Sequence, residues 1–415
     1  MKFRISGIMV CTLAGLFTTV TSYANSFSSA IDSGKVSGYL RAYEWSNSNR
    51  YFSSTNNNTF VIGGKLKAES GVVDHFSAGA AFYTAHSPGL SSNPNQSEPT
   101  LGTDIDTLGE AYLNYHNQSV NVRLGRQKIE TPFANSADYR MIPALYEGAT
   151  LNFLATRDLS FTFGRITRYK SWTDNTFNRT NNETAGPFTK FPGIVNNGFW
   201  YAGIHDSLNQ QTRTLTSQGW YYDFSNIAHL AFIDEKLALK ETKSFNPFIG
   251  LQYVNEKSEG QELFGKVNAR AYGINIGGSF SQDSLSLGAI HIPAKIGTFN
   301  NGGLASPYTD GYGSAALYTG NMLLPTEGLG SGNAYVVSGS HVFNSQWSGW
   351  AAYNRFNQTS SNSPVQPINE YVISLTFLPE GYFKGVKLND MLGYATSSGN
   401  SHHFIQNRLM AQYDF

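Results

Sequence analysis

The final stretch of the chain, residues 404–415, alternates between apolar and polar side chains up to its last position. Ile405, Leu409 and Phe415 share one face, and the opposite face is mostly polar. A period of two is typical of a β-strand with one apolar and one polar surface. Chain ends are usually polar and frayed, so a regular pattern that ends on an aromatic residue indicates an ordered final strand. An edge strand of a soluble β-sandwich is the alternative interpretation.

Segments with the same alternation recur along the chain, separated by stretches rich in Asn, Ser, Gly and Pro. They lie at 36–46, 58–69, 75–85, 108–116, 119–127, 147–156, 159–169, 198–206, 213–224, 227–234, 246–256, 270–280, 283–292, 333–343, 346–356, 369–378, 384–396 and 403–415. Their number is even, as single-chain bacterial barrels require. The connections between them alternate between short and long. We therefore predict an all-β fold, a transmembrane antiparallel β-barrel of about 18 strands in one domain.

The composition favours a membrane barrel over a soluble protein. Charged residues make up only 14 % of the chain, whereas a typical soluble domain has about 25 %. Aromatic residues also contribute 14 %, and the mean hydropathy is −0.30. These values suit a barrel whose outside faces lipid and whose inside faces water. The formal net charge of zero gives no indication of a nucleic-acid partner.

The first residues, 1–24, have the features of a secretory signal peptide. Lys2 and Arg4 precede a largely apolar run at 5–17 that is too short to span a bilayer. Small residues then mark a cleavage site after position 24. We therefore expect export, with 25–415 forming the barrel domain. The single cysteine lies in the removed segment, so disulfide bonds are not expected to stabilise the mature chain.

One segment between two predicted strands, residues 124–148, has a more specific pattern. Local features alone are equally compatible with an ordinary external loop. The segment resembles the OprD family of substrate-selective outer-membrane channels through these motifs: Gly125-Arg126-Gln127, Thr131-Pro132, Asp138-Tyr139-Arg140, Pro143 and Glu147-Gly148. Further similarity, to a second inward loop and to the last three strands of the family, lies at 306–311, 317–319, 370–371, 381–386 and in the final strand.

The resemblance implies that two long loops fold into the barrel and form a constriction. The residues that it places there are Asp138, Tyr139, Arg140, Tyr308 and Asp310. Opposed charges at a narrow point create a transverse field and a polar substitute for hydration. Asp138 and Arg140 would project in the same direction from an extended backbone and so face a solute together. Alternatively, they pair with charges of the barrel wall and pin the loop.

The resemblance also implies a row of inward basic side chains that guides carboxylates. The candidates are Arg41, Lys65, Lys67, Arg123, Lys387 and Arg408, together with Arg126 and Arg168, whose direction the pattern does not define. Many relatives carry alternating arginines in the penultimate strand, where this chain has only Lys387, so the row is thinner. Tyr413 and Phe415 match the C-terminal signal that the barrel-assembly machinery reads.

The sequence thus predicts an outer-membrane channel for passive, selective uptake of small polar molecules, such as carboxylates or amino acids. An oligosaccharide porin, for example for chitooligosaccharides, is the alternative, because aromatic residues are plentiful. A barrel enzyme is more distant, since no catalytic, metal-binding or phosphate-binding motif stands out, and no cofactor or metal is expected. A plugged structural or adhesive barrel is a further alternative. The expected partners are a small polar solute, outer-membrane lipid and the assembly machinery, with the chain acting as a monomer or weak homotrimer.

Overall fold

The computed structural model describes residues 28–89, 101, 104–185, 190–240, 245–309, 316–320, 322–359 and 367–415. The strands are β1 (Lys35–Ser48), β2 (Asn57–Glu69), β3 (Phe76–His86), β4 (Ile105–His116), β5 (Val120–Gln127), β6 (Glu130–Thr131), β7 (Ala134–Asn135), β8 (Leu145–Leu154), β9 (Leu159–Lys170), β10 (Phe199–Asn209), β11 (Arg213–Phe224), β12 (Ala228–Leu239), β13 (Asn246–Ser258), β14 (Asn268–Phe280), β15 (Asp283–Ile292), β16 (Ser331–Val342), β17 (Trp347–Thr359), β18 (Ile368–Phe377), β19 (Val386–Ser397) and β20 (Phe404–Asp414). Short helices are η1 (Arg50–Phe52), η3 (Phe299–Asn301), η4 (Glu327–Leu329), η5 (Gly381–Phe383) and an α-helical segment at 28–32. Within these residues no helix is both long and apolar enough to cross a membrane.

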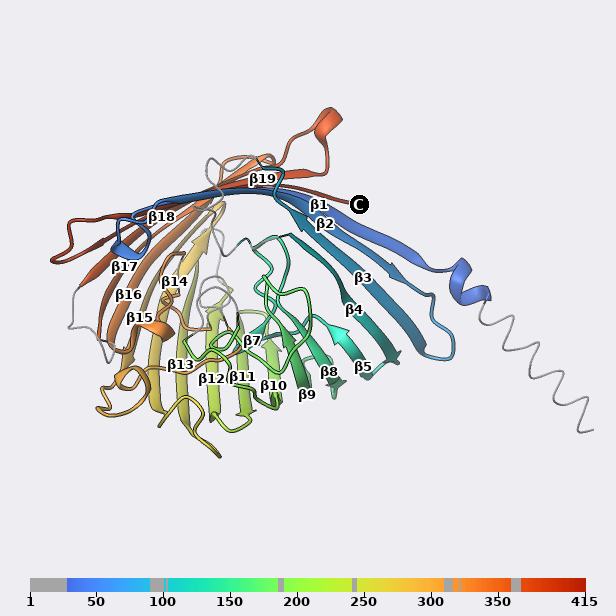
Figure 1. Ribbon diagram of the computed structural model, residues 1–415, viewed down its shortest axis with the longest axis horizontal. Helices are drawn as coiled ribbons and strands as arrows, with labels where there is room; N and C mark the ends of the chain where they lie inside the picture. Colours follow the sequence, from blue (N-terminus) through green and yellow to red (C-terminus); the bar gives the residue numbers. More distant parts are fainter. Residues whose placement is uncertain are drawn as a thin grey trace, which may run out of the picture.

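The long strands form one closed antiparallel sheet of 18 strands, and β6 and β7 stand apart as a small hairpin. Closure is made by β1 and β20, whose register joins Tyr39 to Asp414. The last residue still takes part, because Phe415 and Gly38 exchange two backbone hydrogen bonds of 3.1 and 2.9 Å. Figure 1 shows the blue and red ends of the chain lying side by side. The predicted barrel is confirmed, and each predicted segment coincides with one of its strands apart from shifts at the strand ends.

The two ends of the barrel differ in their connections. Tight turns such as 117–119 and 343–346 lie at the end where β1 begins and β20 finishes. Polar side chains make these turns: the Asn117 Oδ1 accepts hydrogen bonds from the N–H groups of Ser119 (2.9 Å) and Val120 (2.8 Å). The long connections leave the opposite end. Short turns are periplasmic and long loops extracellular in outer-membrane barrels, which orients the chain.

The wall has an apolar outer face and a more polar inner face. Leu40 of β1 is exposed on the outside, whereas its neighbours on both sides in the sequence are buried inside the barrel. Aromatic pairs lie on the outer face. Trp347 and Phe377 have ring centroids 4.4 Å apart near the periplasmic end, and Tyr353 and Tyr371 are 5.0 Å apart about halfway along β17. Aromatic residues near a barrel end are typical of the membrane–water interface.

The first inward loop, residues 128–144, crosses the interior of the barrel. It contains the hairpin of β6 and β7, whose turn residue Phe133 is fully buried and packs on Phe232 of β12 with ring centroids 5.3 Å apart. Farther along the loop, Asp138 lies beside Arg41 of β1. Because β1 and β12 are half the ring of strands apart, the loop reaches opposite walls. Figure 1 shows coil from the middle of the chain inside the ring of strands.

The second inward loop lies between β15 and β16, and its described residues, 293–309, 316–320 and 322–330, are fastened to two other parts of the wall. The carboxylate of Glu256 on β13 accepts the N–H of Ala305, and that of Glu370 on β18 accepts the N–H of Leu323, each at 2.7 Å. Both glutamates are fully buried. Buried polar groups are stable only when they are hydrogen-bonded, so these pairs fix the path of the loop. The expectation of two loops folded into the barrel is confirmed.

Candidate pore constriction

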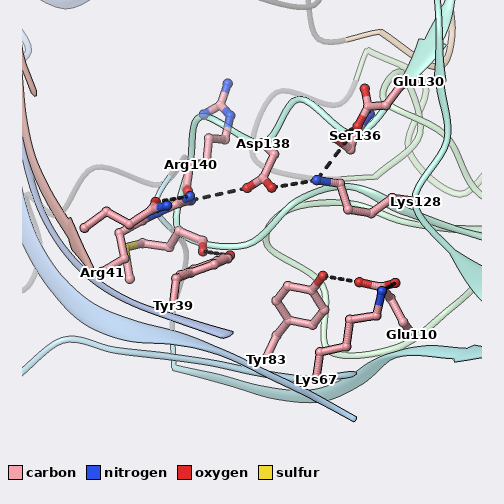
Figure 2. A network of polar contacts seen from close by, with 12 residues as sticks. Tyr39, Arg41, Lys67, Tyr83, Glu110, Lys128, Glu130, Ser136, Asp138 and Arg140 are labelled. Atoms are coloured by element: carbon pink, nitrogen blue, oxygen red, sulfur yellow. Dashed lines mark hydrogen bonds and ion pairs between the residues drawn. The ribbon is translucent and has the colours of Figure 1, made fainter. Parts of the chain in front are cut away.

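Asp138 in the first inward loop lies between two cations. Its Oδ1 is 3.3 Å from the Nη1 of Arg41 on β1, and its Oδ2 is 2.7 Å from the Nζ of Lys128. Arg41 also donates to the backbone carbonyl oxygen of Arg140 and, at 2.9 and 2.7 Å, to the side chain of Gln412 on β20. Figure 2 shows Asp138 between the two cations, with the Arg140 guanidinium directed away from it. The loop is thereby tied to the seam where the barrel closes.

The expectation that Asp138 and Arg140 project in the same direction is wrong. The preceding residue, Ala137, has a positive φ of 46°, so the backbone turns here instead of running extended. Asp138 pairs with a cation of the wall and a cation of the loop, as the alternative interpretation required. The Arg140 side chain reaches a different set of partners. Asp138 thus pins the loop, whereas the Arg140 side chain contacts a different part of the lumen.

The pairing of Asp138 gives the loop a predictable pH response. Burial would raise the pKa of the Asp138 carboxyl, but the charges of Arg41 and Lys128 outweigh this and hold the pKa below its usual value. The ionised carboxylate therefore stabilises the loop above the ordinary pKa of about 3.9, and this contribution is lost as the pH falls through the lowered pKa. We expect channel conductance to be steady at neutral and mildly acidic pH and to change only below about pH 3.9.

Single-channel recordings over a pH series test this expectation. At neutral pH, the Asp138→Asn variant should already show the conductance that the native channel shows in acid, because its side chain is never charged. A transition of the native channel near neutral pH would contradict the assignment of a lowered pKa to Asp138.

Arg140 belongs to a stack of cations and aromatic rings. Its guanidinium carbon lies 4.3 Å from the ring centroid of Trp172 and 5.4 Å from that of Trp45. Arg408 of β20 approaches the ring of Trp45 to 3.9 Å and donates to the backbone carbonyl oxygen of Met322 at 3.0 Å. Cation–π contacts orient a guanidinium group without neutralising its charge. The stack therefore presents oriented positive charge where both inward loops meet β1 and β20.

A cavity of about 290 Å³ lies against this stack. It is lined by Arg50, Arg140 and Arg408, by the indoles of Trp45 and Trp172, and by apolar side chains of the second inward loop. A guanidinium group offers a planar fork of donors that matches a carboxylate. The indole rings add flat apolar surface for the remainder of a small solute. The cavity thus combines anion recognition with an apolar wall.

Acidic side chains are distributed unevenly between this cavity and a second one. Glu183 and Glu327 contribute to the first cavity, where four cationic side chains outnumber them. The second cavity, of about 420 Å³, is lined by Glu130, Asp138 and Asp234, and Lys128, which pairs with Glu130 and Asp138, lies beside this lining. The first inward loop contributes to both cavities. A separation of positive and negative linings creates a transverse field across the lumen.

Six of the predicted lumen cations lie on inward positions of their strands. They are Arg41, Lys65, Lys67, Arg123, Lys387 and Arg408. Lys67 is paired, with its Nζ 3.1 Å from the carboxylate of Glu69 and 3.9 Å from that of Glu110. Arg123 lies over the ring of Tyr112 at 4.2 Å. Part of the row is therefore engaged by neighbours on the wall.

Arg126 and Arg168 do not belong to the lumen row, because both face outward. Arg126 shares a face of β5 with Leu124, which is 49 % exposed on the outer surface, and pairs in register with Glu147. Arg168 pairs with Glu147 from the other side. A β-bulge between Glu147 and Gly148 interrupts the alternation between β8 and β9. Counting in steps of two therefore could not give the direction of Arg168.

Tyr308 is also misplaced by the sequence-based prediction. It is 1 % exposed and packs among the rings of Tyr146, Tyr169 and Phe199, with centroids 6.3, 5.6 and 4.3 Å away. Its hydroxyl donates to the Asn196 side chain at 2.8 Å. Tyr308 therefore fastens the second inward loop within an aromatic cluster and does not contact the solute path.

The remaining candidates for the constriction are Tyr139 and Asp310. The ring of Tyr139 lies 5.2 Å from the guanidinium carbon of Arg140 and 5.8 Å from that of Arg408, so it borders the cation stack. Asp310 lies outside the described residues. Trp45 was not among the predicted site residues, although strand alternation places it on the inner face of β1. Trp172 was not predicted either, because a loop sequence contains no comparable signal.

Comparison with known proteins gives a family match and several structures of the same fold. A family model described as outer membrane porin, OprD family, matches residues 103–292. Residues 103–292 of this chain are therefore similar to the OprD family. Solved structures with the same fold include Pseudomonas aeruginosa OccK9 (OpdG), with a TM-score of 0.77 and 14 % identity, aligned over 93 % of this chain and 99 % of that chain. A BenF-like porin from Pseudomonas fluorescens Pf-5 has a TM-score of 0.75 and 13 % identity, and P. aeruginosa OpdK with vanillate has 0.74 and 14 %, both with the same coverage. Among curated protein sequences, none matches.

The family match and the fold together define the setting of this chain. It is a barrel of the bacterial outer membrane and a channel for small polar molecules, as predicted. The matched family consists of porins. Tyr413 and Phe415 end the last strand with their rings 6.4 Å apart on the exposed outer face. In this setting, the cavity beside Trp45 is a part of the described lumen that is lined by oriented cations.

Proposed function

We propose that this porin takes up small solutes that carry a carboxylate, such as aromatic acids or amino acids, by passive and selective diffusion. One observation carries the proposal: Arg140 and Arg408 both approach the indole of Trp45 beside a cavity of about 290 Å³. A carboxylate accepts paired hydrogen bonds from a guanidinium group, and an apolar body can lie on the indole. OpdK, which is similar in fold, was solved with vanillate, an aromatic carboxylate.

Two further features bear on the class of solute. The acidic lining of the second cavity would attract an ammonium group, which extends the proposal to amino acids. An oligosaccharide carries no charge for these groups to recognise, so a sugar porin is the less favoured function. The proposal contains no catalytic step.

The proposal also covers how the chain reaches the membrane. Residues 1–24 act as a cleavable signal peptide, and residues 25–415 form the barrel domain. The C-terminal Tyr413 and Phe415 are read by the assembly machinery, and the assembled porin works as a monomer or weak homotrimer. Sequencing the N-terminus of the mature protein and measuring its mass in detergent test these points.

Planar-bilayer recordings test the solute class. We expect benzoate, added under a salt gradient, to block single-channel current at lower concentration than chitobiose, and the reversal potential to indicate anion preference. The Arg140→Gln variant should weaken benzoate block by about tenfold, because a hydrogen bond to a charged group contributes about 1.5–3 kcal/mol.

The matched control is Arg355→Gln, which removes an exposed arginine of β17 on the outer face. It should leave benzoate block unchanged. Block by chitobiose alone would support an oligosaccharide porin instead, and the absence of any conductance would support a plugged barrel.

A further inference from the structure

Three arginines face the outside of the barrel on neighbouring strands. Arg126 of β5 and Arg168 of β9 flank Glu147 of β8, at 3.1 Å (Nε to Oε2) and 3.6 Å (Nη1 to Oε1). Arg165 of β9 lies over the ring of Trp200 on β10, 5.3 Å from its centroid. In the part of the chain that the structure describes, Glu147 is the one carboxylate within 4.0 Å of these guanidinium groups. The cluster therefore carries more positive than negative charge.

The faces of the strands show that these side chains point toward lipid. Arg126 follows Leu124 on the same face of β5, and Arg165 follows Phe163 on the same face of β9. Leu124 is 49 % exposed and Phe163 is 47 % exposed. Every second side chain of a strand lies on the same face, so the arginines continue the lipid-facing surface toward the extracellular end. They are not part of the solute path.

The height of the cluster corresponds to the headgroup layer of the extracellular leaflet. Arg165 is the register partner of Trp200, and tryptophan is typical of the membrane–water interface. Arg168 is three positions closer to the extracellular end of β9, which is about 7 Å along the membrane normal for a strand tilted by about 45°. The polar layer on each side of the hydrocarbon core is about 5–8 Å thick. Arg126 and Arg168 lie in the same row across β5, β8 and β9.

Arg165 is held in place by donating to the backbone carbonyl oxygens of Ile166 (2.6 Å) and Asn197 (2.7 Å), whereas Arg126 and Arg168 have weaker partners. Arg168 is half exposed and only 3.6 Å from Glu147, and Arg126 is about a third exposed and rests on the ring of Phe177 at 4.7 Å. Exposed ion pairs of this kind contribute little to stability, so their partners exchange readily. A phosphate group offers more oxygen acceptors than one shared carboxylate and binds guanidinium groups in bidentate fashion.

We propose that Arg126, Arg165 and Arg168, with the indole of Trp200, form a docking site for the phosphorylated headgroup of an outer-leaflet glycolipid of the lipid A type. The phosphate binds the arginine row, and the sugar lies against the indole. Glu147 holds the two outer arginines apart and opposes the phosphate charge. The site is independent of the lumen and of the solute that passes through it.

Binding measurements on the full barrel in a neutral detergent test the proposal. The probes are diphosphoryl lipid A, monophosphoryl lipid A, phosphatidylcholine and inorganic phosphate, with native mass spectrometry as the readout. We expect diphosphoryl lipid A to bind most tightly. The Arg126→Gln/Arg168→Gln double variant should weaken it by at least about tenfold, because charge-assisted phosphate contacts are lost.

A second variant separates a lipid site from a merely structural cluster. Glu147→Gln removes the one opposing charge and should tighten lipid A binding, whereas loss of a structural ion pair would leave binding unchanged or weaker. The control Arg355→Gln, on β17 at the opposite side of the ring, should bind lipid A as the native barrel does.

Three results would overturn the proposal. They are equal binding of the native barrel and the double variant, equal loss in the Arg355→Gln control, and lipid A binding that Glu147→Gln does not tighten. Competition by inorganic phosphate as strong as that by lipid A would assign the site to free phosphate instead and would also reject the lipid. Benzoate block should be unaffected in all these variants. A failure of the lipid A proposal can therefore be distinguished from a failure of the proposed solute class.

Discussion

The Phe133→Ala variant is expected to conduct more current and to discriminate less between solutes than the native channel. Phe133 is fully buried, 5.3 Å from the ring of Phe232 and 6.1 Å from that of Tyr222, and its N–H donates to the Tyr222 hydroxyl at 3.2 Å. Truncating a buried phenylalanine to alanine lowers the stability of the packed state by about 3–5 kcal/mol. That shifts the equilibrium between a fastened and a released loop by more than about a hundredfold.

Two variants sharpen this test. Phe153→Ala removes a ring of the same size that is 39 % exposed on the outer surface, and it should leave conductance unchanged. Tyr222→Phe removes only the hydroxyl that accepts the Phe133 N–H and should have a smaller effect than Phe133→Ala. If Phe133→Ala folds as a barrel yet conducts like the native channel, the tip of the first inward loop does not restrict the lumen.

The Glu370→Ala variant is expected to loosen the second inward loop. Glu370 is fully buried, and its Oε1 accepts the N–H of Leu323 at 2.7 Å. Without the carboxylate, a buried amide is left without an acceptor, which costs about 1–3 kcal/mol. Arg408 donates to the adjacent Met322 carbonyl oxygen, so the displaced loop also disturbs the cation stack. We expect noisier single-channel current and weaker benzoate block.

Conservative replacement distinguishes the role of the hydrogen bond from that of the charge. Glu370→Gln keeps an oxygen acceptor for Leu323 and should restore most of the native block. Glu256→Ala, which removes the acceptor of the Ala305 N–H, should act on the same loop, so the effects of the double variant should not be additive. Glu44→Ala removes an exposed carboxylate of β1 and serves as the control. Native-like current and block in Glu370→Ala would show that this carboxylate does not position the loop.

Part of the candidate site follows from local pattern. Arg41 and Arg408 were found because strand alternation places them on the inner face, and the same rule could have identified Trp45. The loop residues were found only as a motif, which named Asp138 and Arg140 but not their partners. Lys128 and Trp172 had no periodic signal. Their importance arises from the folding of two long loops against the wall.

The sequence by itself determined the barrel. Strand alternation, turn residues and a low content of charge are local properties, and each side of a strand must match either lipid or water. The tertiary structure alone decided which distant groups meet. The path of the first inward loop brings Asp138 to Arg41 and turns Arg140 toward Trp172, and one β-bulge accompanies the outward orientation of Arg168. Contacts between a loop and a wall depend on the whole path of the chain, and no period in the sequence records that path.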